Sequence, residues 1–270
     1  FFFHPDAGIR DCLLSRGLGD VYKRQYADRA EYHGDPDYYD VPVGAILSKK
    51  YSQDLSNTIT EYRTPDGQIF EGELKKYDES PDTTHFSIID SNGNAVSNTY
   101  TLGSSFGSGV TIDKGGFLMN NQMRNFSHFY GKNDAEYGTS EANKLEPGKR
   151  MISTQTPTLV FDPNDELMMI LGSPGGGRIP NIITQVISNI IDHDMSFTES
   201  VMAPRINQRL EGSLQLETGF SPDTITLLKL KGHNVEKSTT MGSVQAIFLE
   251  GDNIYGVADT RRPGALAKGD

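Results

Sequence analysis

The residue with the clearest capacity for chemistry is Thr83, which opens the run Thr-Thr-His-Phe-Ser directly behind a loop at residues 79–82. Cleavage of the peptide bond between Asp82 and Thr83 would give Thr83 a free α-amine beside its own hydroxyl. One residue would then supply both the nucleophile and the general base of an acyl transfer. Threonine pairs are also favoured in strands, so the alternative is that this pair is only structural.

A series of short motifs follows Thr83 in a fixed order along the chain. They are Asn-Gly-Asn-Ala-Val at 92–96, Thr-Tyr-Thr-Leu at 99–102, Phe-Gly-Ser-Gly at 106–109, Asn-Asn-Gln-Met at 120–123, Gly-Ser-Pro-Gly-Gly at 172–176 and Gly-Phe-Ser-Pro-Asp-Thr at 219–224. This order resembles the small subunit of the γ-glutamyltranspeptidases, a family of N-terminal nucleophile hydrolases. Upstream, Tyr-Ala-Asp-Arg at 26–29 and Gly-Asp-Pro-Asp at 34–37 resemble the end of the family's large subunit, so the resemblance covers residues 26–270.

The resemblance also suggests how the chain is organised. Residues 11–25 look like translated sequencing-adapter DNA, with a short natural leader as the alternative, and we leave residues 1–25 out of the fold prediction. We expect residues 26–82 to be the tail of a large subunit and residues 83–270 to be a small subunit with an N-terminal threonine. Because the family is made as a longer precursor, we expect a fragment. Family resemblance implies a periplasmic or secreted location, for which no leader is present.

Composition excludes several classes of partner. The chain has 36 Asp and Glu against 25 Lys and Arg, a formal net charge of −11, and its basic residues are scattered. Nucleic acids and anionic membranes require clustered Lys and Arg, so we expect neither as a partner. The one cysteine, Cys12, lies in the excluded leader, which argues against disulfides and cysteine-bound metals elsewhere. The histidines lack ligand spacing, and we expect no metal or other cofactor.

Hydrophobic patterning predicts both strands and helices. Isoleucine and valine recur at helical spacing from Ile179 to Ile191, and Ser196 and Ser221 are expected to cap two further helices. Three β-hairpins are expected, formed by residues 85–89 with 95–101, 158–161 with 167–171, and 244–250 with 253–257. Antiparallel strands combined with helices indicate an α+β fold. The family resemblance implies part of an αββα four-layer sandwich.

The resemblance implies further catalytic residues. Thr101 matches the family threonine whose hydroxyl hydrogen-bonds the nucleophile, and Gly175 and Gly176 match the oxyanion hole. Glycines at a helix N-terminus let backbone N–H groups approach a developing oxyanion. The alternatives are an ordinary strand residue and a flexible helix-entry loop. A phosphate-binding loop is excluded, because Gly177 is followed by Arg-Ile rather than by Lys and Ser or Thr.

The acyl pocket implied by the resemblance is only partly matched. Gln122 is present, and Ser153 with Thr154 replaces the family's serine pair that holds the substrate α-carboxylate. Gly103 stands where many bacterial members have asparagine, and Asn125 stands where the family commonly has an aspartate that pairs with the α-ammonium group. The family arginine that binds the α-carboxylate belongs to a part of the large subunit outside this sequence.

Two loops admit alternatives. Residues 126–150 occupy the place of a lid loop, in which Tyr137 resembles the gating tyrosine, although a plain surface loop is an equal alternative. Residues 103–107 fit the G-x-S-x-G nucleophile elbow of serine hydrolases. An elbow must turn straight into a helix, whereas the residues that follow have the composition of a loop.

The resemblance therefore implies a γ-glutamyl hydrolase or transferase that acts on glutathione-like amides. The acceptor would be an amino acid, a peptide or water, and the partner would be the large subunit of the same precursor. The neutral Asn125 keeps open a second activity, that of a glutaryl or cephalosporin acylase. A third possibility is an inactive fragment that acts only as an assembly partner.

Overall fold

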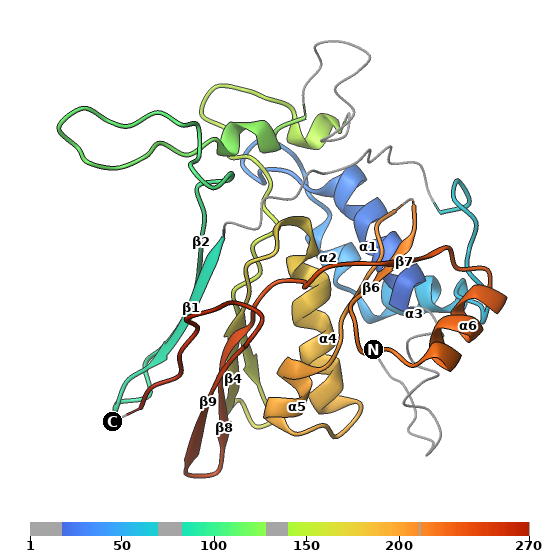
Figure 1. The fold of residues 1–270 in the computed structure, drawn as a ribbon. Helices are drawn as coiled ribbons and strands as arrows, with labels where there is room; N and C mark the ends of the chain where they lie inside the picture. The colour runs from blue at the N-terminus through green and yellow to red at the C-terminus, as the bar shows by residue number, and fades with distance from the viewer. Residues whose placement is uncertain (1–17, 70–82, 128–139, 211, 270) are drawn as a thin grey trace. The chain divides into compact units, whose positions relative to one another are not determined.

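The computed structural model describes residues 18–69, 83–127, 140–210 and 212–269 (Figure 1). Asp82 and Tyr137, to which the sequence analysis assigns a processing and a lid role, lie outside the described residues. The chain divides into two compact units, each described by itself. Unit 1 comprises Phe1–Asp78, Met123–Ser153 and Ile206–Thr239, and unit 2 comprises Glu79–Gln122, Thr154–Arg205 and Thr240–Asp270.

Unit 2 is built on a four-stranded antiparallel sheet in the order β3-β4-β8-β9. The strands are β3 (Thr158–Phe161), β4 (Leu167–Gly172), β8 (Gln245–Glu250) and β9 (Asn253–Ala258). Strand β4 is buried on both faces, which explains its nearly continuous apolar sequence. Met169 and Leu171 join the main core, whereas Ile170 points to the opposite face and is also fully buried.

Helices α4 (Ile179–Ile191) and α5 (Phe197–Met202) cover one face of this sheet (Figure 1). The isoleucine stripe of α4 packs with Leu171 and Phe248 in one core, as its 3.6-residue spacing predicts. Helix α5 begins with a capping box in which Ser196 and Glu199 satisfy each other's backbone N–H groups. Phe197 then stacks on Phe248 with ring centroids 4.5 Å apart.

A separate hairpin, β1 (Thr84–Ile89) and β2 (Ala95–Tyr100), packs on the sheet face opposite α4 and α5. Its inward side chains are polar: Ser87 Oγ donates to Gln245 O at 3.1 Å, and Ser97 Oγ donates to Leu171 O at 2.9 Å. Helices, sheet and hairpin thus form three successive layers. In the part of unit 2 that the structure describes, no helix covers the outer face of the hairpin, where Phe86 and Ile88 are exposed.

The three predicted hairpins are confirmed, each to within a residue or two of its expected bounds, and so are the helices capped by Ser196 and Ser221. Asn92-Gly93 forms the first turn, where Gly93 adopts a positive φ of 82°.

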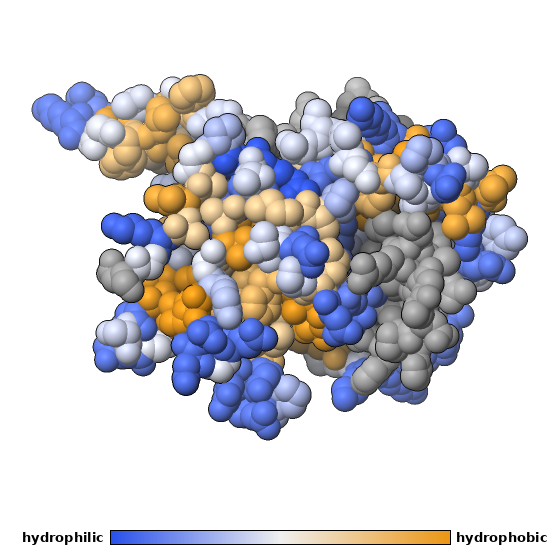
Figure 2. Space-filling view, turned by 60° about the horizontal axis from the view of Figure 1, so that its bottom comes forward, coloured by the Kyte–Doolittle hydropathy of each residue, from blue (hydrophilic) through white to orange (hydrophobic). Residues whose placement is uncertain are grey.

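On the face that Figure 2 presents, exposed apolar side chains in orange are separated by polar ones in blue.

Unit 1 contains short strands and helices around a smaller core. Its elements are α1 (Leu18–Tyr32), α2 (Val43–Ile46), α3 (Lys49–Asn57), the 3-10 turn η2 (Glu141–Asn143), β5 (Ile206–Asn207), β6 (Leu214–Leu216), α6 (Pro222–Leu230) and β7 (Val235–Lys237). Strand β6 pairs antiparallel with β5 and parallel with β7. Tyr26 of α1, Leu214 and Leu228 meet in the core. The sequence analysis did not predict α2, α3 or these short strands.

The start of α1 corrects the expectation that residues 1–25 lie outside the fold. Residues 18–25 form its first half, and Tyr22 and Lys23 are only 2% and 1% exposed. Lys23 Nζ donates to Thr64 O at 3.0 Å and to Asp66 Oδ1 at 2.9 Å. The exclusion is therefore wrong for residues 18–25, while the adapter origin of the segment stays a prediction.

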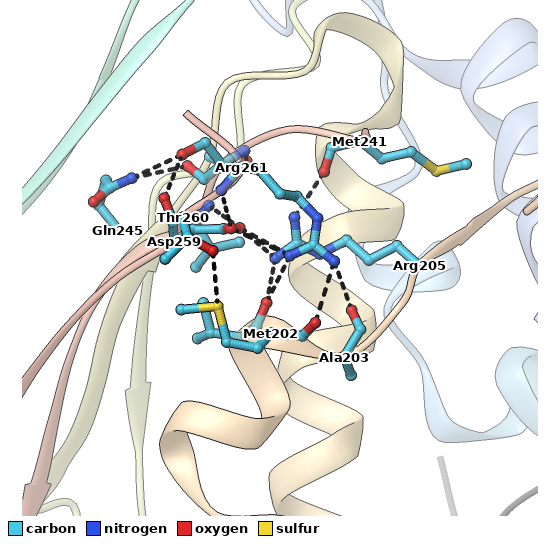
Figure 3. Close-up of polar contacts among 12 residues, drawn as sticks. Met202, Ala203, Arg205, Met241, Gln245, Asp259, Thr260 and Arg261 are labelled. Atoms are coloured by element: carbon cyan, nitrogen blue, oxygen red, sulfur yellow. Dashed lines mark hydrogen bonds and ion pairs between the residues drawn. The ribbon is translucent and has the colours of Figure 1, made fainter. Parts of the chain in front are cut away.

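A buried charged cluster joins three segments of unit 2 (Figure 3). Arg205 Nη2 lies 2.7 Å from Asp259 Oδ2, and the two side chains are 2% and 0% exposed. Arg205 Nη1 also donates to Met241 O at 2.7 Å, and Arg261 Nη2 donates to Ala203 O at 2.8 Å. Burial alone would raise the pKa of Asp259, but the Arg205 charge and backbone N–H donors outweigh it and hold that pKa below its usual range. The cluster therefore fixes the end of β9 against the residues that follow α5.

Replacing Asp259 with Asn should destabilise unit 2 strongly, because it leaves the buried Arg205 without its counter-charge. Breaking a buried ion pair from one side costs about 3–5 kcal/mol. We expect D259N to lower the free energy of unfolding in urea by about 3 kcal/mol. The matched change D252N, in the exposed turn between β8 and β9, should alter it by less than about 0.5 kcal/mol. Equal stability of the two variants would contradict this role of Asp259.

Candidate active site

Thr83 and Thr101 lie opposite each other at the open end of the β1–β2 hairpin. The last registered pair is Thr84 with Tyr100, so Thr83 and Thr101 occupy the next pair of positions. Both share the inward face of the hairpin with His85, and Thr83 is 4% exposed. The main-chain oxygen of Thr83 accepts a hydrogen bond of 2.7 Å from Arg262 Nη1. The hairpin thus brings together the predicted nucleophile and the predicted hydroxyl partner.

Thr101 begins a tight loop that contains two more predicted residues. Its Oγ1 accepts from Gly103 N at 2.9 Å, and its carbonyl oxygen accepts from Gln122 Nε2 at 3.4 Å. Gly103 has a φ of 95°, and a Cβ there would lie 2.1 Å from Asn121 Oδ1. The backbone conformation and the close approach of Asn121 therefore favour glycine at position 103.

Gly175 and Gly176 lie in the connection from β4 to α4 and have φ values of 144° and 56°. Both conformations are unfavourable for residues with a side chain. A Cβ on Gly175 would also approach Ile182 Cδ1 to 3.0 Å. Gly176 opens the 3-10 turn η3 (Gly176–Arg178) that leads into α4. The first N–H groups of such a helical segment have no partner within the helix and can bind an oxyanion.

Three residues that the sequence analysis did not single out hold this loop. Ser173 is fully buried, and its Oγ donates to Pro174 O at 2.6 Å and accepts from Ser243 N at 3.0 Å. Gly242 packs so closely that a Cβ would lie 2.5 Å from Ser173 Oγ. The available signal was the Gly-Ser pair at residues 242–243, shortly before β8, because a glycine near a strand often marks a close approach of two backbones.

A cleft of about 590 Å³ opens beside Thr83. Its lining includes Thr83, His85, Pro174, Ser243 and Arg262. Thr83 therefore borders the same cavity as Pro174, which lies in the loop that carries the two glycines. Chain segments from 262 to 268 form another wall of this cleft.

His85 lies on β1 and packs against Gly172 at the end of β4, just before the glycine loop. Its ring is 5% exposed and lies against Gly172, where an added Cβ would come within 2.2 Å of the ring. Nδ1 lies 2.8 Å from Thr99 Oγ1, and Nε2 lies 3.1 Å from Ser87 Oγ. Burial lowers the pKa of His85 to about 4, so the ring is neutral at pH 7. His85 lies two residues after Thr83, and its ring sets the distance between β1 and the backbone of Gly172.

The other predicted pocket residues are divided between the two units. Asn125 and Ser153 belong to unit 1, whereas Thr154 belongs to unit 2, where its carbonyl oxygen accepts from Thr156 Oγ1 at 3.0 Å. In unit 1, Asn125 O accepts a hydrogen bond of 2.7 Å from Asn143 Nδ2. Asn143 is 1% exposed. Asn143, which lies within the predicted loop at residues 126–150, is therefore held in the interior of unit 1.

One alternative, the serine-hydrolase elbow, loses support from the structure. Residues 101–121 form bends and turns with no helix, so the serine-hydrolase elbow at residues 103–107 is excluded.

Among the residues that the structure describes, no group of His, Cys, Asp or Glu side chains is arranged to hold a metal ion. In the same part of the chain, no helix has the length and apolar composition needed to cross a membrane.

Comparison with known proteins identifies relatives along nearly the whole chain. The family model described as gamma-glutamyltranspeptidase matches residues 15–269. The glutathione hydrolase proenzyme of Escherichia coli (strain K12) is 40% identical over 257 residues, which cover 93% of this chain and 44% of that relative. The chain thus spans less than half the length of the curated relatives that it matches.

Solved structures give the same assignment of the fold. Gamma-glutamyltranspeptidase from Pseudomonas nitroreducens, in complex with L-DON, is 37% identical with a TM-score of 0.63 and covers 69% of this chain and 100% of that chain. Cephalosporin acylase from Bacillus halodurans is 25% identical with a TM-score of 0.78 and covers 100% of this chain and 47% of that chain. The α+β fold of N-terminal nucleophile hydrolases, predicted from the sequence, is confirmed by these similarities.

The buried neutral state of His85 predicts a decline in stability at acid pH. The unfolded chain takes up a proton at this residue near pH 6.5, whereas the folded chain does so only near pH 4. The contribution of His85 is therefore complete above pH 6.5 and declines as the pH falls toward 4, by up to about 3 kcal/mol. We expect urea denaturation to show a smaller decline over this range for H85Q than for wild type. The control H193Q, at the end of α4, should keep the wild-type decline, and an identical decline in H85Q would refute the assignment.

Proposed function

We propose that this chain, which belongs to the γ-glutamyltranspeptidase family, is the C-terminal part of a precursor that cleaves itself between Asp82 and Thr83. Residues 26–82 would end the large subunit, and residues 83–270 would form the small subunit. The matured protein would act as a γ-glutamyl hydrolase or transferase. The observation that carries this proposal is the facing pair Thr83 and Thr101, which stands beside the cleft that also borders the glycine loop.

The reaction would run as acyl transfer through Thr83. Thr83 Oγ attacks the amide carbonyl carbon while the new α-amine takes the hydroxyl proton and passes it to the leaving amine. The acyl group is then held as an ester until water or an amino acid attacks it and releases Thr83. Backbone N–H groups of Gly175 and Gly176 would stabilise the oxyanion, and each such donor is worth about 3 kcal/mol in the transition state.

The substrate would be a glutathione-like γ-glutamyl amide, a proposal supported by the glutathione hydrolase names of the relatives. Gln122, Ser153 and Thr154 would bind the acyl group through its α-carboxylate end, and Asn125 would face its α-amine. The partner would be the large subunit of the same precursor. We expect no metal or cofactor to take part.

A second candidate function is that of a glutaryl or cephalosporin acylase. It is supported by Asn125, which is a neutral amide, and by the similarity to a cephalosporin acylase structure. An amide leaves no unpaired buried charge when the acyl group has no amine, so glutaryl amides become acceptable substrates.

The role of Thr83 is tested by substitution in the full-length precursor. T83A removes the hydroxyl and should leave a single unprocessed chain without amidase activity, whereas T83S should keep part of both activities. Intact mass spectrometry measures the cleavage, and release of p-nitroaniline from γ-glutamyl-p-nitroanilide measures the activity. T84A, whose side chain lies on the exposed face of β1, is the matched control and should process normally. Normal processing of T83A would exclude Thr83 as the nucleophile.

The role of Asn125 is tested by restoring the carboxylate. A charge-assisted bond to an α-ammonium is worth roughly 1.5–3 kcal/mol, against about 1 kcal/mol for a neutral amide. N125D should therefore raise the ratio of kcat/KM for γ-glutamyl-p-nitroanilide over glutaryl-p-nitroanilide by about tenfold. An unchanged ratio would mean that Asn125 does not face the substrate amine.

A further inference from the structure

Asn143 is a buried side chain whose amide joins two segments of unit 1. Its Nδ2 donates to Asn125 O at 2.7 Å, and its Oδ1 accepts from Ile152 N at 3.2 Å. Its own carbonyl oxygen accepts from Ser127 N at 2.9 Å. The side chain thus uses both ends of the amide to hold the backbone at residue 125 and the backbone next to Ser153.

The segment that leads to Ser153 is held by a second side chain at Arg150, two residues before Ile152. Asp35, whose side chain is 1% exposed, accepts from Arg150 N at 2.8 Å and from Arg150 Nε at 3.0 Å. Residues 150 and 152 are therefore fixed by two independent buried acceptors. Asn143 links this anchored segment directly to the backbone of Asn125.

We propose that Asn143 is a positioning residue for acyl recognition, which sets the separation between the Asn125 backbone and the segment that carries Ser153. This inference rests on the proposed function, because it takes Asn125 and Ser153 to face the α-amine and the α-carboxylate of the acyl group. These two groups sit on one carbon atom of the substrate. A small change in the spacing of their binding residues would weaken recognition of a γ-glutamyl group, without touching Thr83.

The chemistry of the amide explains why only asparagine serves here. Aspartate has the same shape and keeps the acceptor for Ile152 N, but it replaces the donor to Asn125 O with a second oxygen. Two oxygens at hydrogen-bond distance repel each other, so the backbone at residue 125 must move. Alanine removes both bonds and leaves two partly buried backbone groups without this partner.

The test compares N143D and N143A with N98D, a matched change on the exposed face of β2. Each variant is made in the full-length precursor and assayed for cleavage between Asp82 and Thr83, thermal midpoint, and kcat and KM for γ-glutamyl- and glutaryl-p-nitroanilide. We expect N143D to raise KM for the γ-glutamyl substrate about tenfold, with kcat and processing within about twofold of wild type. The glutaryl substrate, which lacks the amine, should lose less, and N98D should match wild type.

A double-mutant cycle with N125D gives the second measurement. If Asn143 positions residue 125, the roughly tenfold gain in selectivity from N125D should shrink to about twofold in the N143D background. Full gain in that background would overturn the proposal. Loss of folding or processing in both N143D and N143A, or an equal loss for both substrates, would assign Asn143 a merely structural role and overturn it as well.

Failure of this inference is distinguishable from failure of the proposed function. A processed wild-type protein that hydrolyses γ-glutamyl-p-nitroanilide, with unchanged selectivity in N143D, refutes the inference alone. A wild-type precursor that neither processes nor hydrolyses either substrate refutes the proposed function and the inference together.

Discussion

The buried ion pair between Arg205 and Asp259 is the interaction on which the candidate active site depends. Met241 O and Val201 O accept hydrogen bonds from the buried guanidinium, and the Val244 N–H donates to the buried carboxylate, which offsets part of the cost of removing the two charges from water. These hydrogen bonds fix the segment at 241–244 and the end of β9 in one arrangement. The first segment holds Ser173 before the glycine loop, and the second continues to Arg262, which binds the main chain of Thr83.

Close packing beneath the site adds a second constraint. The His85 ring takes the space that a side chain at residue 172 would need, so this ring of β1 packs directly on the backbone of β4. Gly242 allows a similar approach from the other side of the loop. Oxyanion stabilisation depends on donors that are fixed before the reaction, and these contacts would supply that rigidity. The geometry is thus consistent with the acyl transfer that we propose.

Local patterns predicted the elements that carry the site better than their surroundings. The Asn-Gly turn at residues 92–93 and the N-cap Ser196 have strong local signals, and their elements lie where expected. Asn143 and the Arg205–Asp259 pair have none, because their burial arises from contacts between residues 9 to 54 positions apart. Residues 18–25 were left out because they look like translated adapter DNA, yet Tyr22 packs in a core. Side-chain roles at Asn125 and Ser153 came from family resemblance alone.

Covalent trapping of the nucleophile tests the central claim most directly. The full-length precursor would be incubated with an electrophilic γ-glutamyl analogue, digested, and analysed by tandem mass spectrometry. We predict a single label on the hydroxyl of Thr83, in a peptide whose N-terminus is Thr83 itself. A label on Ser104 or Ser105, or on a peptide that still continues through Asp82, would contradict the account.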